Sequence, residues 1–352
     1  MSKVNYQEYS SFLPGWIKDA QQYLYRIPER PELMCYGTGY NTWGVQTNQK
    51  ALSAFAIAAV DPSIDWNSVG LKREEVLEQA ISMLRFSLES HIEGSYYCTD
   101  GEKWGHTWIS VLGIERMMHA VEAIWDLLTD RDHALLKKVL ISEADWLLEE
   151  YPIQAGLIIN NKPESNIWNG ALLSRVALYY PDAPNAERYK EKATQFFING
   201  ISIEDDQFNE TVYDGQKVKD AFVGANFFNT YACNHHGYMN VGYMVICLSN
   251  IAMLHFSFKA RGEKAPEALY HHAYDLWKLI RSLTFEDGRL WRIGGDTRAR
   301  YCYCQDYALP MWAFVEDMYD EDCEEFERGW LSTLRTEVDY NGDGSFLSSR
   351  LG

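Results

Sequence analysis

The chain has 352 residues, of which 47% are apolar and 23% charged, a composition that excludes an intrinsically disordered protein. Its formal net charge of −18 argues against nucleic acid and membrane surfaces as partners, because both require a basic face. We find no apolar run of 18 residues and no apolar segment near the start of the chain. We therefore expect no membrane-spanning helix and no signal peptide, and a cytoplasmic location.

A helical period of apolar residues dominates the chain from beginning to end. Apolar side chains recur at positions i, i+3, i+4 and i+7, which predicts amphipathic helices. Weaker helical patterns lie at 14–26 and 217–230, and 289–295 is the one short stretch with an extended pattern. The clear helical segments are 51–60, 74–92, 108–128, 133–151, 169–180, 186–201, 243–262, 266–285, 307–319 and 322–338.

Stop signals separate these helices, and the connections between them are short. Pro184 ends one segment and Asn185 is placed to cap the next, while Gly262 is placed to end the helix over 243–262. With no linker and no shift in composition, we predict one domain over 1–352. About ten to twelve antiparallel helices without strand partners favour an all-α fold, an (α/α) toroid that is a complete or incomplete (α/α)6 barrel. A stacked helical solenoid is the alternative.

The seven cysteines are scattered and form no CxxC pair, which is typical of reduced thiols. Cys233 and His235 are close in sequence, but their spacing matches no standard set of metal ligands. We therefore predict no metal and no other cofactor. His271 and His272 fall inside the predicted helix 266–285, and we interpret them as ordinary helix residues.

Five polar and aromatic clusters stand where helices end or begin, and we expect them to converge at one rim of the toroid. They lie at 36–48, 100–108, 161–170, 234–244 and 292–307. Aromatic residues make up 14% of the chain, and rings that stack on sugars next to polar partners are typical of carbohydrate sites. The candidate substrate-binding residues are Trp43, Trp104, Asn166, Trp168, Tyr238, Arg300, Gln305 and Asp306.

The segment NHHGYMNVGYM at 234–244 is the strongest candidate for acid–base chemistry. A histidine and a tyrosine that face one substrate can remove a proton α to a carboxylate and protonate the leaving oxygen, which is a β-elimination. We expect His236 and Tyr243, seven residues apart and so about two turns apart if the segment is helical, to form this pair, with His235 as an alternative or helper. The alternative is a purely structural role as a capped helix start, for which Asn234 and Gly237 are suited.

Beta-elimination also needs a group that neutralises the substrate carboxylate. Amides and guanidinium groups can do this, and Asn166, Asn169, Arg298 and Arg300 have the right chemistry. Asp296, Arg298 and Arg300 alternate, so that in an extended segment they share one face. We expect them either to bind the substrate carboxylate through the arginines or to form an internal network of salt bridges.

The order Asn, His, Tyr, Arg along a helical toroid resembles the polysaccharide lyases of the chondroitin AC, hyaluronate and alginate lyase type and their heparinase II/III-like relatives. The resemblance implies cleavage of uronate-containing poly- or oligosaccharides. It implies Asn166 or Asn169 as neutraliser, His236 or His235 as base or its helper, Tyr243 as acid and base, and Arg298 or Arg300 as support. The closing segment over 340–352 is similar to the junction at which such enzymes continue into a β domain.

Two other interpretations remain open. A glycoside hydrolase on the same toroid, similar to the unsaturated glucuronyl hydrolases, would need two facing carboxylates. Its candidates are Glu164, Asp296 and Asp306, followed by Asp100 and Glu102. The other alternative is a non-enzymatic helical binding module in which the clusters are packed helix caps. The oligomeric state has no signature in the sequence.

Overall fold

The computed structural model describes residues 4–293 and 301–346. Helices account for 59% of the structure and strands for 5%, and the described residues form no closed sheet. The predicted all-α class is therefore confirmed. The strands occur only as short antiparallel pairs, which are β1 with β2, β3 with β4 and β5 with β6.

The chain divides into two compact units. Unit 1 comprises Met1–Val4 and Leu147–Trp330, and unit 2 comprises Asn5–Trp146 and Leu331–Gly352. The division points fall within helix α6 (Asp130–Glu149) and helix α13 (Glu324–Asn341). The single domain over 1–352 and the junction over 340–352 stay predictions, and residues 347–352 lie outside the described part.

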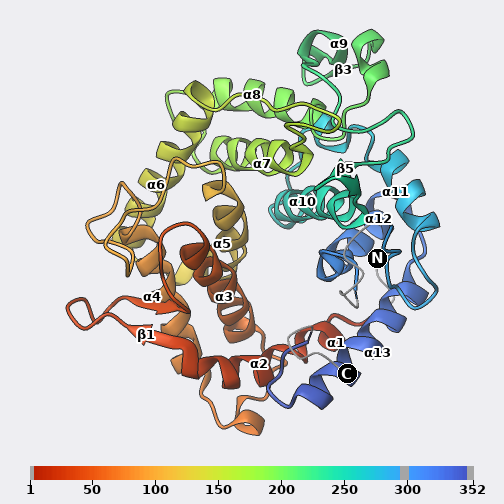
Figure 1. The fold of residues 1–352 in the computed structure, drawn as a ribbon. Helices are drawn as coiled ribbons and strands as arrows, with labels where there is room; N and C mark the ends of the chain where they lie inside the picture. Colours follow the sequence, from red (N-terminus) through yellow and green to blue (C-terminus); the bar gives the residue numbers. More distant parts are fainter. Residues whose placement is uncertain (1–3, 294–300, 347–352) are drawn as a thin grey trace. The chain divides into compact units, whose positions relative to one another are not determined.

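Unit 2 is built around helix α3 (Trp43–Val60), which packs between α4 (Arg73–Glu89) and α5 (Ser110–Ile124) (Figure 1). The small and apolar face of α3 is fully buried, with Leu52, Phe55 and Ala56 at its centre. The pair β1 (Leu24–Arg26) and β2 (Met34–Tyr36) lies beside α4. The remaining elements are α1 (Tyr6–Ser10), α2 (Leu13–Ala20) and the 3-10 helices η1 (Gln21–Tyr23), η2 (Trp66–Val69) and η3 (Trp125–Leu127).

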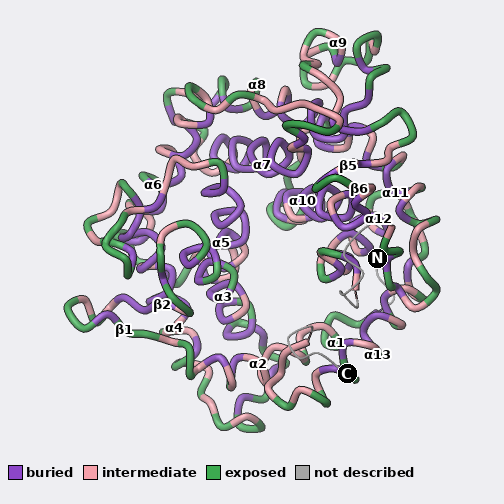
Figure 2. Tube along the Cα trace, in the orientation of Figure 1, coloured by how far each residue is buried: buried purple, intermediate pink, exposed green. Residues whose placement is uncertain are grey.

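Unit 1 is built around helix α10 (Val241–Ala260), which packs against α7 (Pro163–Tyr179), α11 (Ala273–Ser282) and α12 (Ala308–Tyr319). Helix α7 also packs against α8 (Ala186–Ile198), and Figure 2 shows α7 and α10 buried along most of their length. The shorter elements are η4 (Glu204–Phe208), β3 (Val212–Tyr213), β4 (Gln216–Lys217), α9 (Val218–Ala221), β5 (Asn234–His235), β6 (Tyr238–Met239), η5 (Glu267–Tyr270) and η6 (Gln305–Tyr307).

Helix α10 is the one described helix that is long and apolar enough to cross a membrane. Of its apolar stretch, 83% is buried inside the structure. A helix that is hydrophobic all round is also what the centre of a large core requires. Its burial by α7, α11 and α12 accounts for its apolar surface.

Several predicted segments differ from the structure at their ends. Only α9 is helical within 217–230, and 14–26 becomes α2, a 3-10 turn and β1. The helix expected over 266–285 starts at Ala273, so the interpretation of His271 and His272 as residues inside it is wrong. In the stretch with the extended pattern, the described residues 289–293 contain one β-bridge, between Leu290 and Thr284. Asn185 stands before α8 as expected, but its side chain makes no capping hydrogen bond. Gly262 has φ +73° directly after α10, as predicted for a helix end.

Candidate functional site

The segment before α10 is a tight β-hairpin. Strands β5 and β6 pair Asn234 with Met239 and His235 with Tyr238, so His236 and Gly237 form the two-residue turn. Their φ angles are 59° and 86°, both left-handed, which is the backbone of a type I′ turn. Glycine adopts this conformation without strain, and histidine is one of the few side chains enriched in it. His236 therefore lies in a turn, and the helical spacing considered for His236 and Tyr243 does not apply.

Helix α10 begins directly after the hairpin and is capped by Asn240. The Asn240 side chain accepts a hydrogen bond from the backbone N–H of Tyr243 at 3.1 Å. This bond satisfies one of the free N–H groups of the first turn and fixes where the helix starts. The cap is therefore Asn240, and the expected caps Asn234 and Gly237 belong to the strand and the turn instead.

Tyr243 lies at the centre of an aromatic cluster. Its Oη is 3.1 Å from Nε2 of His236. Its ring stacks on His235, with centroids 3.6 Å apart, and on Tyr303, with centroids 5.6 Å apart. His236 and Tyr303 are exposed, while Tyr243 is half-buried. The rings on its two sides hold the phenol in place, and its hydroxyl meets an imidazole that solvent reaches.

His235 is buried and hydrogen-bonded to Asn161, which precedes α7. The Asn161 Nδ2 group donates to the carbonyls of Gly156 and Asn226, at 2.9 and 2.6 Å, so its Oδ1 faces His235 Nδ1 at 2.8 Å. Because this oxygen only accepts, Nδ1 carries the proton. Burial, reinforced by His236, lowers the pKa of His235 to about 4, so its imidazole is neutral at neutral pH.

Glu164 is a buried carboxyl group at the first turn of α7, only 3% exposed. Burial raises its pKa to about 7. Its Oε2 has no hydrogen-bond partner among the residues that the structure describes. Burial is also the main cause that raises the pKa of Tyr243, and the charge of Glu164 adds to it. Tyr243 is therefore a protonated phenol at neutral pH, able to donate.

The amides expected to neutralise a carboxylate have different surroundings. Asn166 is fully buried, donates to the carbonyls of Gln154 and Asn199, and accepts from the N–H of Gln154. All of its groups are engaged with the backbone, which gives it a structural role. Asn169 is also buried, but neither its Oδ1 nor its Nδ2 has a partner within 4–293 and 301–346.

The other candidate residues are spread over both units. Gln305 is buried and bridges the backbone of Gly288 and Leu290, while Trp168 is buried in α7. Tyr238 is half-buried in β6, and Asp306 is exposed in η6. Arg298, Arg300 and Asp296 lie outside the described residues.

Two candidates, Trp43 and Trp104, belong to unit 2. Trp104 is buried, and its Nε1 donates to the carbonyl of Ser87 at 2.7 Å, which makes it a core residue. Trp43 is 58% exposed at the start of α3 and lies edge-to-face with Trp108, which is 46% exposed. The pair Trp43–Trp108 therefore presents two indole rings to solvent.

Sequence reasoning missed Asn161, Tyr303 and the carboxyl chemistry of Glu164. The cluster at 161–170 includes Asn161, but its spacing does not reveal that Asn161 bonds to a histidine 74 positions later. From the sequence, Glu164 is a candidate only as one member of a hydrolytic pair. Its raised pKa follows from burial, which no local pattern shows.

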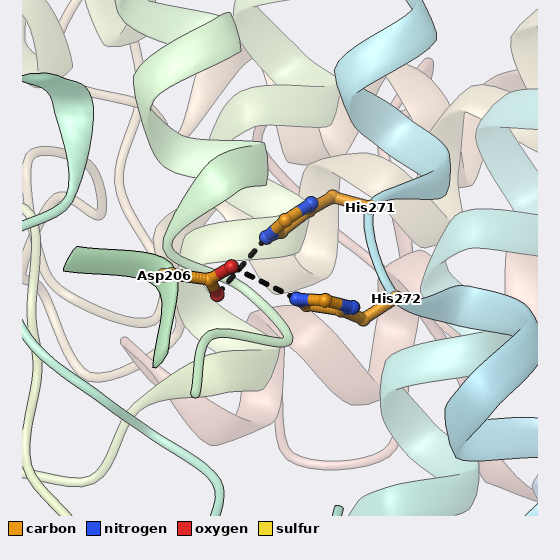
Figure 3. Close-up of side chains that lie close together, drawn as sticks. All are labelled: Asp206, His271 and His272. Carbon is orange, nitrogen blue, oxygen red and sulfur yellow. Dashed lines mark hydrogen bonds and ion pairs between the residues drawn. The ribbon is translucent and has the colours of Figure 1, made fainter. Parts of the chain in front are cut away.

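A different group of side chains has the chemistry to hold a metal ion. Asp206, His271 and His272 each offer one ligand atom, and the three atoms lie within 4.8 Å of one another (Figure 3). No other group of three or more such side chains converges in this way among the described residues. Cys233 and His235, the pair considered in the sequence, instead both contact Asn161.

Comparisons with protein-family models, with curated proteins and with solved structures found no match to this chain.

Proposed function

We propose that the protein is a carbohydrate-active enzyme that cleaves uronate-containing poly- or oligosaccharides by β-elimination. The observation that carries the proposal is the 3.1 Å contact between Nε2 of His236 and Oη of Tyr243 at an accessible position. An imidazole and a protonated phenol in contact are a base and an acid that can exchange a proton. The stacked rings of His235 and Tyr303 hold the acid in one orientation.

The proposed reaction uses His236 as base and Tyr243 as acid. On substrate binding the Tyr243 hydroxyl turns to the glycosidic oxygen, which frees the lone pair on Nε2. His236 then removes the proton α to the uronate carboxylate, the bond to the glycosidic oxygen breaks, a carbon–carbon double bond forms, and Tyr243 protonates the leaving oxygen. The imidazolium returns its proton to the phenolate through their contact, which resets the pair. The raised pKa of Tyr243 favours this division of roles, because the hydroxyl is protonated at neutral pH and no phenolate is present to act as the base.

Two buried polar groups on α7, the helix that packs against α10, support the developing charge in this proposal. Glu164, whose pKa of about 7 leaves much of it protonated at neutral pH, is suited to donate a hydrogen bond to the substrate carboxylate. Asn169, with both polar atoms unpartnered among the described residues, is the second candidate. His235, held neutral by burial and by Asn161, positions the Tyr243 ring rather than moving protons.

The carbohydrate class is inferred from the surface aromatics and from the resemblance in the sequence. The exposed pair Trp43–Trp108 is suited to stack on the C–H face of a sugar ring. We further propose that the helices complete the (α/α) toroid that the resemblance to polysaccharide lyases implies.

The test is turnover of uronate polymers, followed by the far-ultraviolet absorbance of the conjugated product. We expect Tyr243→Phe and His236→Ala each to lower kcat by about 10²–10⁴-fold, the usual contribution of a general acid or base. The matched control is Tyr270→Phe, because Tyr270 Oη also contacts a histidine, Nδ1 of His255 at 2.7 Å, in the same unit. Full turnover in both site variants would overturn the proposal.

A further inference from the structure

The Asp206 carboxylate lies between two adjacent histidines that come from a distant part of the chain. Its Oδ2 is 3.1 Å from Nε2 of His271, and its Oδ1 is 2.9 Å from Nε2 of His272 (Figure 3). Asp206 belongs to η4, and the histidines lie between η5 and α11, 65 positions later. Asp206 and His271 are almost completely buried.

His272 has a carboxylate at each of its ring nitrogens. Nε2 faces Asp206, while Nδ1 is 3.5 Å from Oδ2 of Asp275 and 3.3 Å from Oη of Tyr231. Carboxylate oxygens only accept hydrogen bonds, and a neutral imidazole has only one N–H. Tyr231 Oη can donate to Nδ1 or, at 3.3 Å, to Oδ2 of Asp275. The ring hydrogen of His272 therefore lies either on Nε2, where it donates to Asp206, or on Nδ1, which leaves Nε2 free to bind a cation beside Asp206.

The surroundings fix the orientation of the Asp206 carboxylate. The backbone N–H of Ile203 donates to its Oδ2 at 3.0 Å, and Nδ2 of Asn209 donates to its Oδ1 at 3.1 Å. With the carboxylate held in this way, its two oxygens face the Nε2 atoms of His271 and His272. An anionic carboxylate beside a neutral imidazole is the pairing that binds divalent metals.

We propose that Asp206, His271 and His272 form a binding site for a divalent transition-metal ion, with Zn²⁺ as the best match to two imidazole nitrogens and one carboxylate oxygen. Tetrahedral zinc with bonds of about 2.0–2.1 Å separates its ligand atoms by roughly 3.3 Å. The contacts of 3.1 and 2.9 Å run from His271 and His272 to different oxygens of Asp206, and the three candidate ligand atoms lie within 4.8 Å of one another. A small rearrangement of these side chains would therefore bring all three ligand atoms around one ion. Water completes the coordination.

The hydrogen-bond partners of Nδ1 in His271 and His272 also fit a metal site. Metal-bound histidines usually hold their second nitrogen against a carboxylate or another acceptor, which orients the ring. His272 has Asp275 and Tyr231 in this position, and His271 has Tyr213 Oη at 3.5 Å. Tyr231 lies three positions before β5. A bound metal would therefore also anchor the segment that leads into the hairpin, a role that does not depend on the proposed lyase chemistry.

The test is direct metal binding by the full chain after treatment with a chelator. Co²⁺ serves as the probe, because its visible absorbance reports coordination, and Zn²⁺ is titrated by calorimetry. We expect one equivalent of either ion to bind, and Zn²⁺ to raise the Tm. Asp206→Asn should remove stoichiometric binding. Tyr231→Phe, which keeps all three ligands, should weaken it by about 10-fold or more.

The matched control is His255→Gln. His255 also lies between a carboxylate and a tyrosine, with Nε2 2.9 Å from Asp317 and Nδ1 2.7 Å from Tyr270, but it has no second histidine beside it. Metal binding should survive this change. Wild-type protein that binds neither ion stoichiometrically would overturn the proposal, and so would equal affinity in Asp206→Asn. In that case His272 donates its Nε2 hydrogen to Asp206.

Discussion

At the scale of single residues, Tyr243 is the side chain on which the account depends. Three rings surround it, and each contributes something different. His235 supplies a neutral stacking face, Tyr303 covers the opposite face, and His236 meets the hydroxyl. Burial and the neighbouring Glu164 raise the pKa of Tyr243, so the phenol is protonated at neutral pH, as the proposed role of general acid requires. The chemistry of the cluster therefore follows from burial as much as from residue type.

The burial of Glu164 can be tested through the pH dependence of the free energy of unfolding. Its pKa rises from the ordinary 4.5 to about 7 on folding, which corresponds to roughly 3 kcal/mol. A group whose pKa is raised in the folded state stabilises the protein fully below pH 4.5, and this contribution is lost as the pH rises through 7. We expect the wild type to lose stability between pH 5 and 8, and Glu164→Gln to lose less by about 2–3 kcal/mol.

The measurement is the free energy of unfolding in denaturant at the two pH values for both proteins. The comparison between proteins removes the effect of all other titrating groups. Parallel pH dependence in wild type and Glu164→Gln would show that this carboxyl group titrates normally and is not the neutral donor that the mechanism requires.

At the scale of elements, the hairpin and the start of α10 act together to place His236 and Tyr243, the proposed catalytic pair. The type I′ turn presents His236 outward, and the Asn240 cap fixes the helix that carries Tyr243. Gly237 is the position where this arrangement depends on backbone freedom, because its φ is 86° and no atom lies within 4 Å of an added Cβ. The cost of a side chain there is therefore conformational rather than steric.

Gly237→Ala should destabilise the protein by about 1–2 kcal/mol and lower kcat, since strain in the turn moves His236 away from Tyr243. Gly262→Ala is the matched control. Gly262 has φ +73° after α10, also with no atom near an added Cβ, but it carries no candidate residue. We expect a similar loss in the unfolding free energy and unchanged kcat. Equal kcat in both variants would contradict a role for the turn in placing His236.

The sequence predicted the helices well and the hairpin poorly, for a physical reason. Long amphipathic helices repeat their apolar residues over several turns, so α4, α8 and α13 follow from the pattern. Two-residue strands leave no such period, and the His-Gly turn at 236–237 lacks the usual Asn-Gly signal. The pairing of Asp206 with His271 and His272 depends on chain packing over 65 positions, which periodicity does not encode.

At the scale of the whole molecule, the net charge of −18 bears on the proposed substrate, because a polyuronate is also negatively charged. Like charges repel over a distance set by the ionic strength, about 30 Å at 0.01 M and about 8 Å at 0.15 M salt. We therefore expect kcat/KM for a polyuronate to rise with salt over this range. The control is a methyl-esterified form of the polymer, which should show little salt dependence. A fall in kcat/KM with salt would indicate a basic binding face instead.

The central claim is that the reaction is an elimination, and the mass balance of a defined uronate oligosaccharide tests it most directly. The wild-type protein is incubated with the oligosaccharide, and the masses of the product fragments are measured by mass spectrometry. Beta-elimination predicts two fragments whose masses sum to that of the substrate, with the unsaturated fragment lighter by one water than its hydrolytic counterpart. Fragments whose masses sum to substrate plus one water would contradict the account and assign the protein to the hydrolases.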